Sequence, residues 1–235
     1  MKLGYYRHYG DTEEHGQSSS VMRDIILGMA DGLTVPFAIA AGLAAGAASQ
    51  RLIIAGGLAE IAAGSISMGL GGYLAAKSYL DYYHTEHARE VEETKDKHDV
   101  EVKEVEKILE AYGVPKPESE RTAIAISQNQ SSWVNFMMRF ELGLEKPEKK
   151  QAIKTAVTIA FAYIVGGLIP LSPYIMFSRT DVAFLYSILF TVLGLSLFGF
   201  ARGYFTTGQP AKSAFETLVV GGVAASAAFF LAKII

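Results

Sequence analysis

Apolar and polar positions divide the chain into two apolar blocks with a polar stretch between them. Residues 22–80 and 150–235 are almost entirely apolar or small, whereas residues 81–150 carry most of the charge. A membrane-spanning helix needs about 20 consecutive apolar residues. The first block has room for two such helices, separated near residues 49–51, and the second block has room for three. We therefore predict an all-α fold of five transmembrane helices, with a helical insertion between helices 2 and 3.

The same pattern predicts four parts in the chain. These are a flexible cytosolic tail (1–20), transmembrane helices 1 and 2 (21–80), a soluble domain of three helices (81–150) and transmembrane helices 3 to 5 (151–235). Helix 2 has no stop signal near Tyr79, so we expect it to continue into the soluble domain. Within that domain, Gly113 is expected to end one helix, and residues 118–142 predict another. Pro170 and Pro173 are expected to end the third membrane helix.

Two carboxylates lie inside the apolar runs, Asp31 in helix 1 and Glu60 in helix 2. A charge at the centre of a membrane helix costs at least ~2.5–3.5 kcal/mol, and such residues usually mark an ion or proton path. Pro36 has no N–H, which frees the carbonyl of Gly32 within one turn of Asp31. A carboxylate beside a freed carbonyl supplies the groups of a cation site in a broken helix. The alternative, which we weigh as weaker, is a simple kink with Asp31 paired structurally.

Asp24 and Met68 are further candidates for this path. Asp24 lies two turns before Asp31 on the same helical face. Met68 belongs to a stripe of small and polar residues along helix 2, made up of Gly57, Glu60, Gly64, Ser67, Met68 and Gly71. We expect the stripe to pack against another helix, with Met68 acting either as a ligand or as core filler. Two glycine pairs in helix 1 also predict close helix contacts, Gly28 with Gly32 and Gly42 with Gly46.

Carboxylates in the insertion occur in pairs three residues apart, which places both members of a pair on one helical face. The candidate ligands there are Glu90, Glu93, Glu101, Glu104, Met137, Met138 and Glu141. Paired carboxylates on facing helices bind divalent metals in helical bundles. Lysines are interleaved with these glutamates, however, and the spacing alone favours a solvated charged helix over a metal site.

Charge and cysteine content narrow the function classes. The 235-residue chain has a formal net charge of −3, so no basic field points to nucleic acid. It has no cysteine, which excludes a disulfide framework and a catalytic thiol and leaves methionine sulfur as the soft metal ligand. Residues 1–20 have no apolar core, and no cleavable signal peptide is expected.

Basic residues indicate the membrane topology. They cluster in the N-terminal tail, in the insertion and in the turn that contains Arg202 and Lys212. By the positive-inside rule these parts face the cytosol. Five spans then place the C-terminus on the lumenal side.

Long ordered motifs resemble the vacuolar iron transporter family, close to its plant members. They are D-G-L-T-V-P-F-A-I-A-A-G-L at 31–43, E-I-A-A-G-S-I-S-M-G-L-G-G-Y-L-A-A-K-S at 60–78, F-M-M-R-F-E-L-G-L-E-K-P at 136–147, G-G-L-I-P-L-S-P-Y at 166–174 and S-A-F-E-T at 213–217. The resemblance covers nearly the whole chain after residue 21. Two departures lie near the cytosolic mouth, Ser20 and Tyr79, where relatives often carry an acidic residue.

The resemblance implies a homodimer in the vacuolar membrane that exchanges cytosolic ferrous iron for protons along a path at the dimer interface. It implies that Asp31 and Met68 line the path, with Glu60 and Asp24 as proton or ion partners. It also implies that the seven candidate ligands of the insertion form a cytosolic metal-binding domain, which reverses the preference drawn from spacing. No tightly bound cofactor is implied; Fe²⁺ is the substrate, and Zn²⁺, Mn²⁺ or Co²⁺ are alternative occupants of the same sites.

Three other functions were weighed. A di-iron ferroxidase would use a helical Glu-x-x-His motif, which does not occur in this sequence, so we do not predict an enzyme. A membrane-anchored metal sensor has no use for Asp31 and Glu60 inside the membrane. Transport of manganese or zinc in place of iron stays open.

Overall fold

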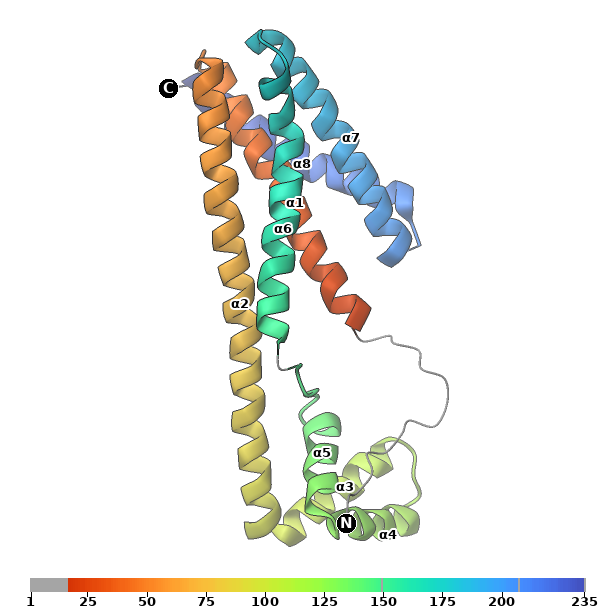
Figure 1. Ribbon diagram of the computed structural model, residues 1–235. Helices are drawn as coiled ribbons and strands as arrows, with labels where there is room; N and C mark the ends of the chain where they lie inside the picture. The colour runs from red at the N-terminus through yellow and green to blue at the C-terminus, as the bar shows by residue number, and fades with distance from the viewer. Residues whose placement is uncertain (1–16, 149, 207, 235) are drawn as a thin grey trace. The chain divides into compact units, whose positions relative to one another are not determined.

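The computed structural model of this protein describes residues 17–148, 150–206 and 208–234. In these residues it contains eight helices and no strand, which confirms the predicted all-α fold (Figure 1). The chain forms two compact units. One unit consists of the described residues up to Tyr73 together with those from Ile153 onward, and the other of Leu74–Ala152. Residues 1–16 of the predicted tail lie outside the described residues.

Five of the described helices are long and apolar enough to cross a membrane, as predicted. They are α1 (Gln17–Ala45), α2 (Gln50–Asp96), α6 (Gln151–Met176), α7 (Thr180–Thr206) and α8 (Pro210–Ile234). Helix α2 is continuous over 47 residues. At about 1.5 Å per residue it is more than twice as long as the hydrocarbon core is thick. Its apolar N-terminal part therefore forms the span, and its charged C-terminal part lies outside the span, as the missing stop signal predicted.

Glycines let helices α1 and α6 approach closely. A Cβ atom placed on Gly28 would lie 2.8 Å from the Cβ of Ala162, and one on Gly32 would lie 2.9 Å from the Cα of Tyr163. Small residues at such positions allow two backbones to meet. The contact predicted for this glycine pair is thus confirmed. The prediction for the second pair is wrong, because a Cβ on Gly46 would meet nothing closer than 3.7 Å.

The stripe predicted along α2 is confirmed in part: a Cβ atom on Gly57 would lie 2.5 Å from a methyl group of Leu171, and one on Gly64 would lie 2.7 Å from Cε1 of Tyr163, both on α6. The C-terminal part of the stripe departs from the prediction. Ser67 is exposed, and a Cβ on Gly71 would have nothing within 4 Å, so both residues point away from the contact. Gly72, outside the predicted stripe, faces α6 instead, where its Cβ would lie 3.1 Å from a methyl group of Thr155. Glu60 and Met68, the two members with candidate chemistry, are both half-buried.

Helix α6 continues past both of its prolines, so the predicted end at Pro170 and Pro173 is wrong. Pro173 cannot donate to the carbonyl of Ile169, but the Ser172 hydroxyl donates to that carbonyl at 2.8 Å. From α7, the buried Ser187 hydroxyl donates to the Pro170 carbonyl at 2.7 Å. A donor such as Ser172 makes a proline tolerable in a membrane helix, because it satisfies the backbone oxygen that the proline leaves free.

The second unit contains three short helices after the polar end of α2. They are α3 (His98–Ala111), α4 (Lys116–Ser127) and α5 (Gln130–Phe140). Gly113, with φ of +88°, follows α3 at the predicted position. The single helix predicted over 118–142 is wrong, because it divides at Asn129. The Asn129 side chain accepts a hydrogen bond from the backbone N–H of Ser132 at 3.0 Å and caps the start of α5.

Candidate functional site

Asp31 lies half-buried on α1, just over one turn before Pro36. Pro36 stands inside the helix and supplies no N–H to the carbonyl of Gly32. Nearby, Thr34 turns its hydroxyl back onto the carbonyl of Ala30, at 2.7 Å. Helix α1 therefore offers a carboxylate and a carbonyl relieved of its usual partner at adjacent positions, and both are oxygen ligands suited to a cation.

Glu60 on α2 has one satisfied and one unsatisfied carboxylate oxygen. Its Oε1 accepts a hydrogen bond from the hydroxyl of Tyr163 on α6. Its Oε2 is buried and has no hydrogen-bond partner among the described residues. Leaving a buried polar atom unpaired costs about 1–3 kcal/mol, and more when it is charged. A proton or a cation on Oε2 would remove that cost, so Glu60 has the chemistry of an exchangeable site.

Tyr163, the hydrogen-bond partner of Glu60, was not predicted from the sequence. It is buried on α6, its backbone lies against Gly32 of α1, and its ring faces Gly64 of α2. The charge of Asp31 acts on the same hydroxyl that bonds Glu60. A signal was present in the sequence, because a buried tyrosine in an apolar helix usually finds a polar partner for its hydroxyl.

Asp24 is the most deeply buried carboxylate of this unit, with 1 % of its surface exposed. Its Oδ1 pairs with the exposed guanidinium of Arg23 at 3.2 Å, while its Oδ2 has no hydrogen-bond partner in the described chain. Asp24 therefore resembles Glu60, because each has one buried carboxylate oxygen that a ligand could satisfy. Met68 is half-buried on α2, and its role as a soft ligand stays a prediction.

Three carboxylates of the other unit converge on one point. Glu90 of α2, Glu101 of α3 and Glu141 at the end of α5 each place an oxygen within 4.8 Å of the other two. Glu90 and Glu101 are buried, and Glu141 is exposed. Three oxygens from three helices form a set of ligands for a hard or intermediate divalent cation. We call these three residues the carboxylate cluster.

Burial and mutual repulsion hold protons on the carboxylate cluster. Burial, together with the charges of Glu141, Glu101 and Glu93, raises the pKa of Glu90 to about 7. Burial raises the pKa of Glu101 and that of Glu141 as well, with nearby glutamates adding to both shifts. A cation would relieve the same repulsion. Protons and a divalent cation can therefore each reduce the repulsion within the cluster.

The remaining predicted ligands of this unit lie around the cluster in two ways. Glu93 and Glu104 are half-buried, and their charges act on Glu141. Met137 and Met138 are buried in two apolar groups: Met137 with Val105, Ala123 and Trp133, and Met138 with Tyr83, Val134 and Leu144. The structure thus gives both methionines a packing role, and their role as ligands stays a prediction.

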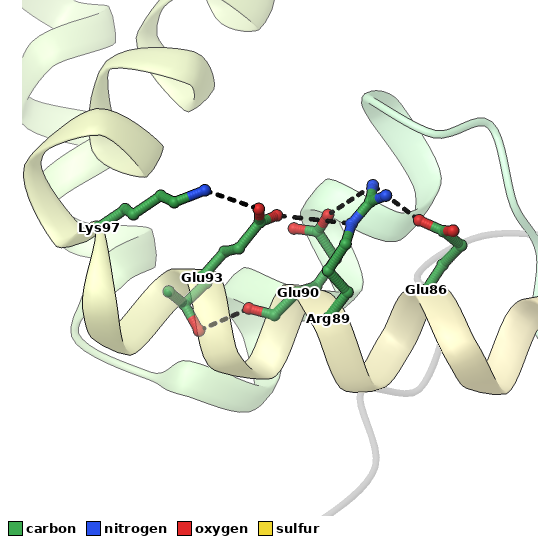
Figure 2. A network of polar contacts seen from close by, with 6 residues as sticks. Glu86, Arg89, Glu90, Glu93 and Lys97 are labelled. Carbon is green, nitrogen blue, oxygen red and sulfur yellow. Dashed lines mark hydrogen bonds and ion pairs between the residues drawn. The ribbon is translucent and has the colours of Figure 1, made fainter.

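Two charged residues beside the cluster were missed. Glu86 is buried one turn before Glu90, and Arg89 pairs with it at 2.7 Å (Figure 2). Glu86 and Arg89 are three residues apart, the spacing of an ordinary ion pair on a polar helix. Sequence alone gave no reason to separate this pair from the other charges of the insertion.

The fold is that of a membrane protein with several spans, and its two groups of carboxylates are suited to binding cations. The model of the VIT family matches residues 22–233, and the chain belongs to this family. It is 49 % identical to vacuolar iron transporter 1 of Arabidopsis thaliana, over 95 % of this chain and 90 % of that protein. It is 50 % identical to vacuolar iron transporter 2 of Oryza sativa subsp. japonica, over 94 % of this chain and 90 % of that protein.

More distant relatives belong to fungi. Protein CCC1 of Saccharomyces cerevisiae is 38 % identical over 92 % of this chain and 69 % of its own length. The family predicted from the motifs is therefore confirmed. The plant relatives are named as transporters, which also confirms the prediction of a transporter rather than an enzyme.

Proposed function

We propose that this protein is a vacuolar-membrane transporter that moves ferrous iron from the cytosol into the vacuole in exchange for protons, along a path at a homodimer interface. The observation that carries the proposal is the placement of Asp24, Asp31 and Glu60 in helices that are otherwise apolar, two of them with an unsatisfied buried oxygen. The names of the plant relatives supply the cargo and the organelle.

Collection of the metal is assigned to the cytosolic unit. The carboxylate cluster offers three oxygens to one ion, and Glu93 and Glu104 add negative charge beside it. Clustered negative charge raises the local concentration of divalent cations. Met137 and Met138 adjoin the cluster in sequence and would add soft sulfur ligands only if they left their apolar packing.

Passage through the membrane is assigned to Asp24, Asp31 and Met68. The thioether of Met68 favours ferrous iron over magnesium and calcium, which prefer oxygen ligands. Across a dimer axis the two copies of Asp31 would repel each other, so one copy would retain a proton. A dication that binds between them displaces that proton, which couples the two fluxes. Glu60, with Tyr163 as its hydrogen-bond donor, is a second proton carrier on the same helices.

Manganese is the second candidate cargo, and one observation favours it. The carboxylate cluster consists of oxygen ligands alone, and carboxylates are ligands that suit manganese. Competition of Mn²⁺ or Zn²⁺ with Fe²⁺ for transport ranks these cargoes.

The function is tested in liposomes that contain the purified protein and a pH-sensitive dye. Anaerobic addition of Fe²⁺ should move protons out of the lumen, whereas Mg²⁺ should not. Proton movement that is equal with both ions, or equal to that of protein-free liposomes, would contradict the proposal. A dimer is tested separately by the mass of the detergent-solubilised protein, which should be twice that of a 25.4 kDa chain.

A further inference from the structure

Arg89 stands at the centre of the acidic face of α2 (Figure 2). Its Nη2 lies 2.7 Å from Glu86 and 3.9 Å from Glu90, and its Nε lies 3.6 Å from Glu93. The side chain is half exposed, with 52 % of its surface accessible. One guanidinium thus contacts three carboxylates of a single helix, and one of them is a member of the carboxylate cluster.

The charge of Arg89 also reaches the cluster member outside α2. Burial raises the pKa of Glu90 and of Glu141, and Arg89 is the cation that opposes both shifts. Lys97 acts in the same direction on Glu101, from its ion pair with Glu93 at 2.9 Å. Each member of the carboxylate cluster is therefore within reach of a protein cation.

We propose that Arg89 is the built-in counter-ion of the metal-free carboxylate cluster, and that a divalent cation binds by displacing its charge from Glu90 and Glu93. The proposal rests on the proposed role of the cluster as a metal site. Arg89 and a dication then compete for the carboxylate of Glu90, while Lys97 pairs with the neighbouring Glu93. Arg89 therefore lowers the affinity of the cluster for metal and limits how firmly a metal is retained.

The distances indicate how the displacement proceeds. The contacts to Glu90 and Glu93 are long for charge-assisted hydrogen bonds, which measure about 2.7–2.9 Å. The contact to Glu86 is short, and Glu86 is not a member of the cluster. Arg89 can therefore release the two long contacts and keep Glu86 as its anchor, while its exposed stem moves toward solvent.

The test compares metal affinity in variants of the full-length protein in detergent. Arg89→Gln removes the charge and should tighten Mn²⁺ binding by roughly five- to tenfold at low ionic strength, as expected for one charge several ångströms from a dication in a largely aqueous medium. Added salt should shrink this difference, because screening weakens the contribution of Arg89. Arg89→Lys keeps the charge and should stay close to the parent protein. Arg121→Gln, the same substitution at an exposed site on α4, is the matched control.

Trp133 provides the readout, since it is the only tryptophan and lies in the apolar group of Met137. Quenching of its fluorescence by paramagnetic Mn²⁺ reports occupancy of the nearby site. Affinity that is unchanged or weaker in Arg89→Gln, or a tightening that is equal in Arg121→Gln, would overturn the inference. A Glu90→Gln/Glu101→Gln double variant separates the two levels: if it binds Mn²⁺ as the parent does, the metal site itself is wrong, and not only the role of Arg89.

Discussion

The hydroxyl of Tyr163 on α6 donates a hydrogen bond to the carboxylate of Glu60 on α2. This contact joins two membrane helices that are far apart in sequence, and the charge of Asp31 on α1 acts on the same hydroxyl. The hydrogen bond fixes the position of the Glu60 carboxylate.

Removing only this hydroxyl is the mildest test of its role. Tyr163→Phe should lower iron transport roughly tenfold or more, because a hydrogen bond to a charged group contributes about 1.5–3 kcal/mol. Iron uptake into liposomes measures the effect. Tyr204→Phe, at an exposed position on α7, is the matched control and should be silent. Equal transport by both variants would remove Tyr163 from the path.

Gly64 tests the same contact from the other helix. A Cβ at this position would lie 2.7 Å from Cε1 of Tyr163. Gly64→Ala should therefore push the tyrosine ring from Glu60, cost about 1–3 kcal/mol of stability through overpacking, and impair transport. Gly71→Ala on the same helix, where an added Cβ meets nothing within 4 Å, should change neither. Thermal unfolding in detergent and iron uptake check both variants; wild-type behaviour of Gly64→Ala would contradict the packing described for α2.

Metal binding to the carboxylate cluster should depend on pH. The pKa of Glu90 is raised to about 7, and those of Glu101 and Glu141 are raised as well. Since metal binds the deprotonated carboxylates, affinity should rise from pH 6 to about pH 8, and binding should release protons. Calorimetry in buffers of different ionisation enthalpy counts those protons. Glu90→Gln should flatten the profile, and a pH-independent affinity in the parent protein would contradict this assignment.

The same shifts predict the stability of the metal-free protein. Glu90 binds a proton more tightly in the folded chain than in the unfolded chain, so folding is favoured most at low pH and loses stability as pH rises from about 4.5 to about 7. The midpoint of thermal unfolding should fall over this range in the absence of metal. Added Mn²⁺ should restore it, because it binds the folded state. A midpoint of thermal unfolding that rises with pH in metal-free buffer would contradict this prediction.

Tyr79 makes two hydrogen bonds with the backbone of Glu145, a contact that a glutamate in its place could not make in full. Its hydroxyl donates to the carbonyl of Glu145 at 3.0 Å and accepts from the N–H of the same residue at 3.2 Å. Tyr79→Phe should speed hydrogen exchange at Glu145 by roughly fivefold, the effect of about 1 kcal/mol. Tyr82→Phe, exposed one turn later, is the control.

Periodicity and composition predicted the number of membrane helices because a span needs a long apolar run whatever its partners. They also singled out Asp31 and Glu60, since a charge in an apolar run is visible in a single chain. For the carboxylates of the insertion, spacing alone favoured a solvated helix, and the resemblance to a family supplied the prediction of a metal site. Which residues of α2 pack against α6 at the C-terminal end of the predicted stripe was not predictable in this way. It depends on which side chains of α6 meet Gly72 rather than Gly71, and that is a property of two helices together.

The remaining errors have a common cause in local hydrogen bonds. Pro170 and Pro173 resemble helix ends in the sequence, but the Ser172 hydroxyl satisfies the carbonyl of Ile169 that Pro173 leaves free, and the helix continues. In the sequence, Asn129 resembles a residue within a long helix, but in the structure its side chain caps the start of α5. In the sequence, nothing distinguishes Tyr163 from the apolar residues around it, but in the structure its hydroxyl donates to Glu60. Each residue has two possible roles in sequence, and only the partner decides between them.

The central claim is that carboxylates inside the membrane carry metal in one direction and protons in the other. It is tested most directly by measuring iron-driven proton flux in liposomes for the parent protein and for Asp31→Asn, at matched protein content and with folding checked by thermal unfolding. We predict that the folded variant loses the proton flux that Fe²⁺ drives. A folded Asp31→Asn protein that moves protons in response to Fe²⁺ at the parent rate would contradict the claim.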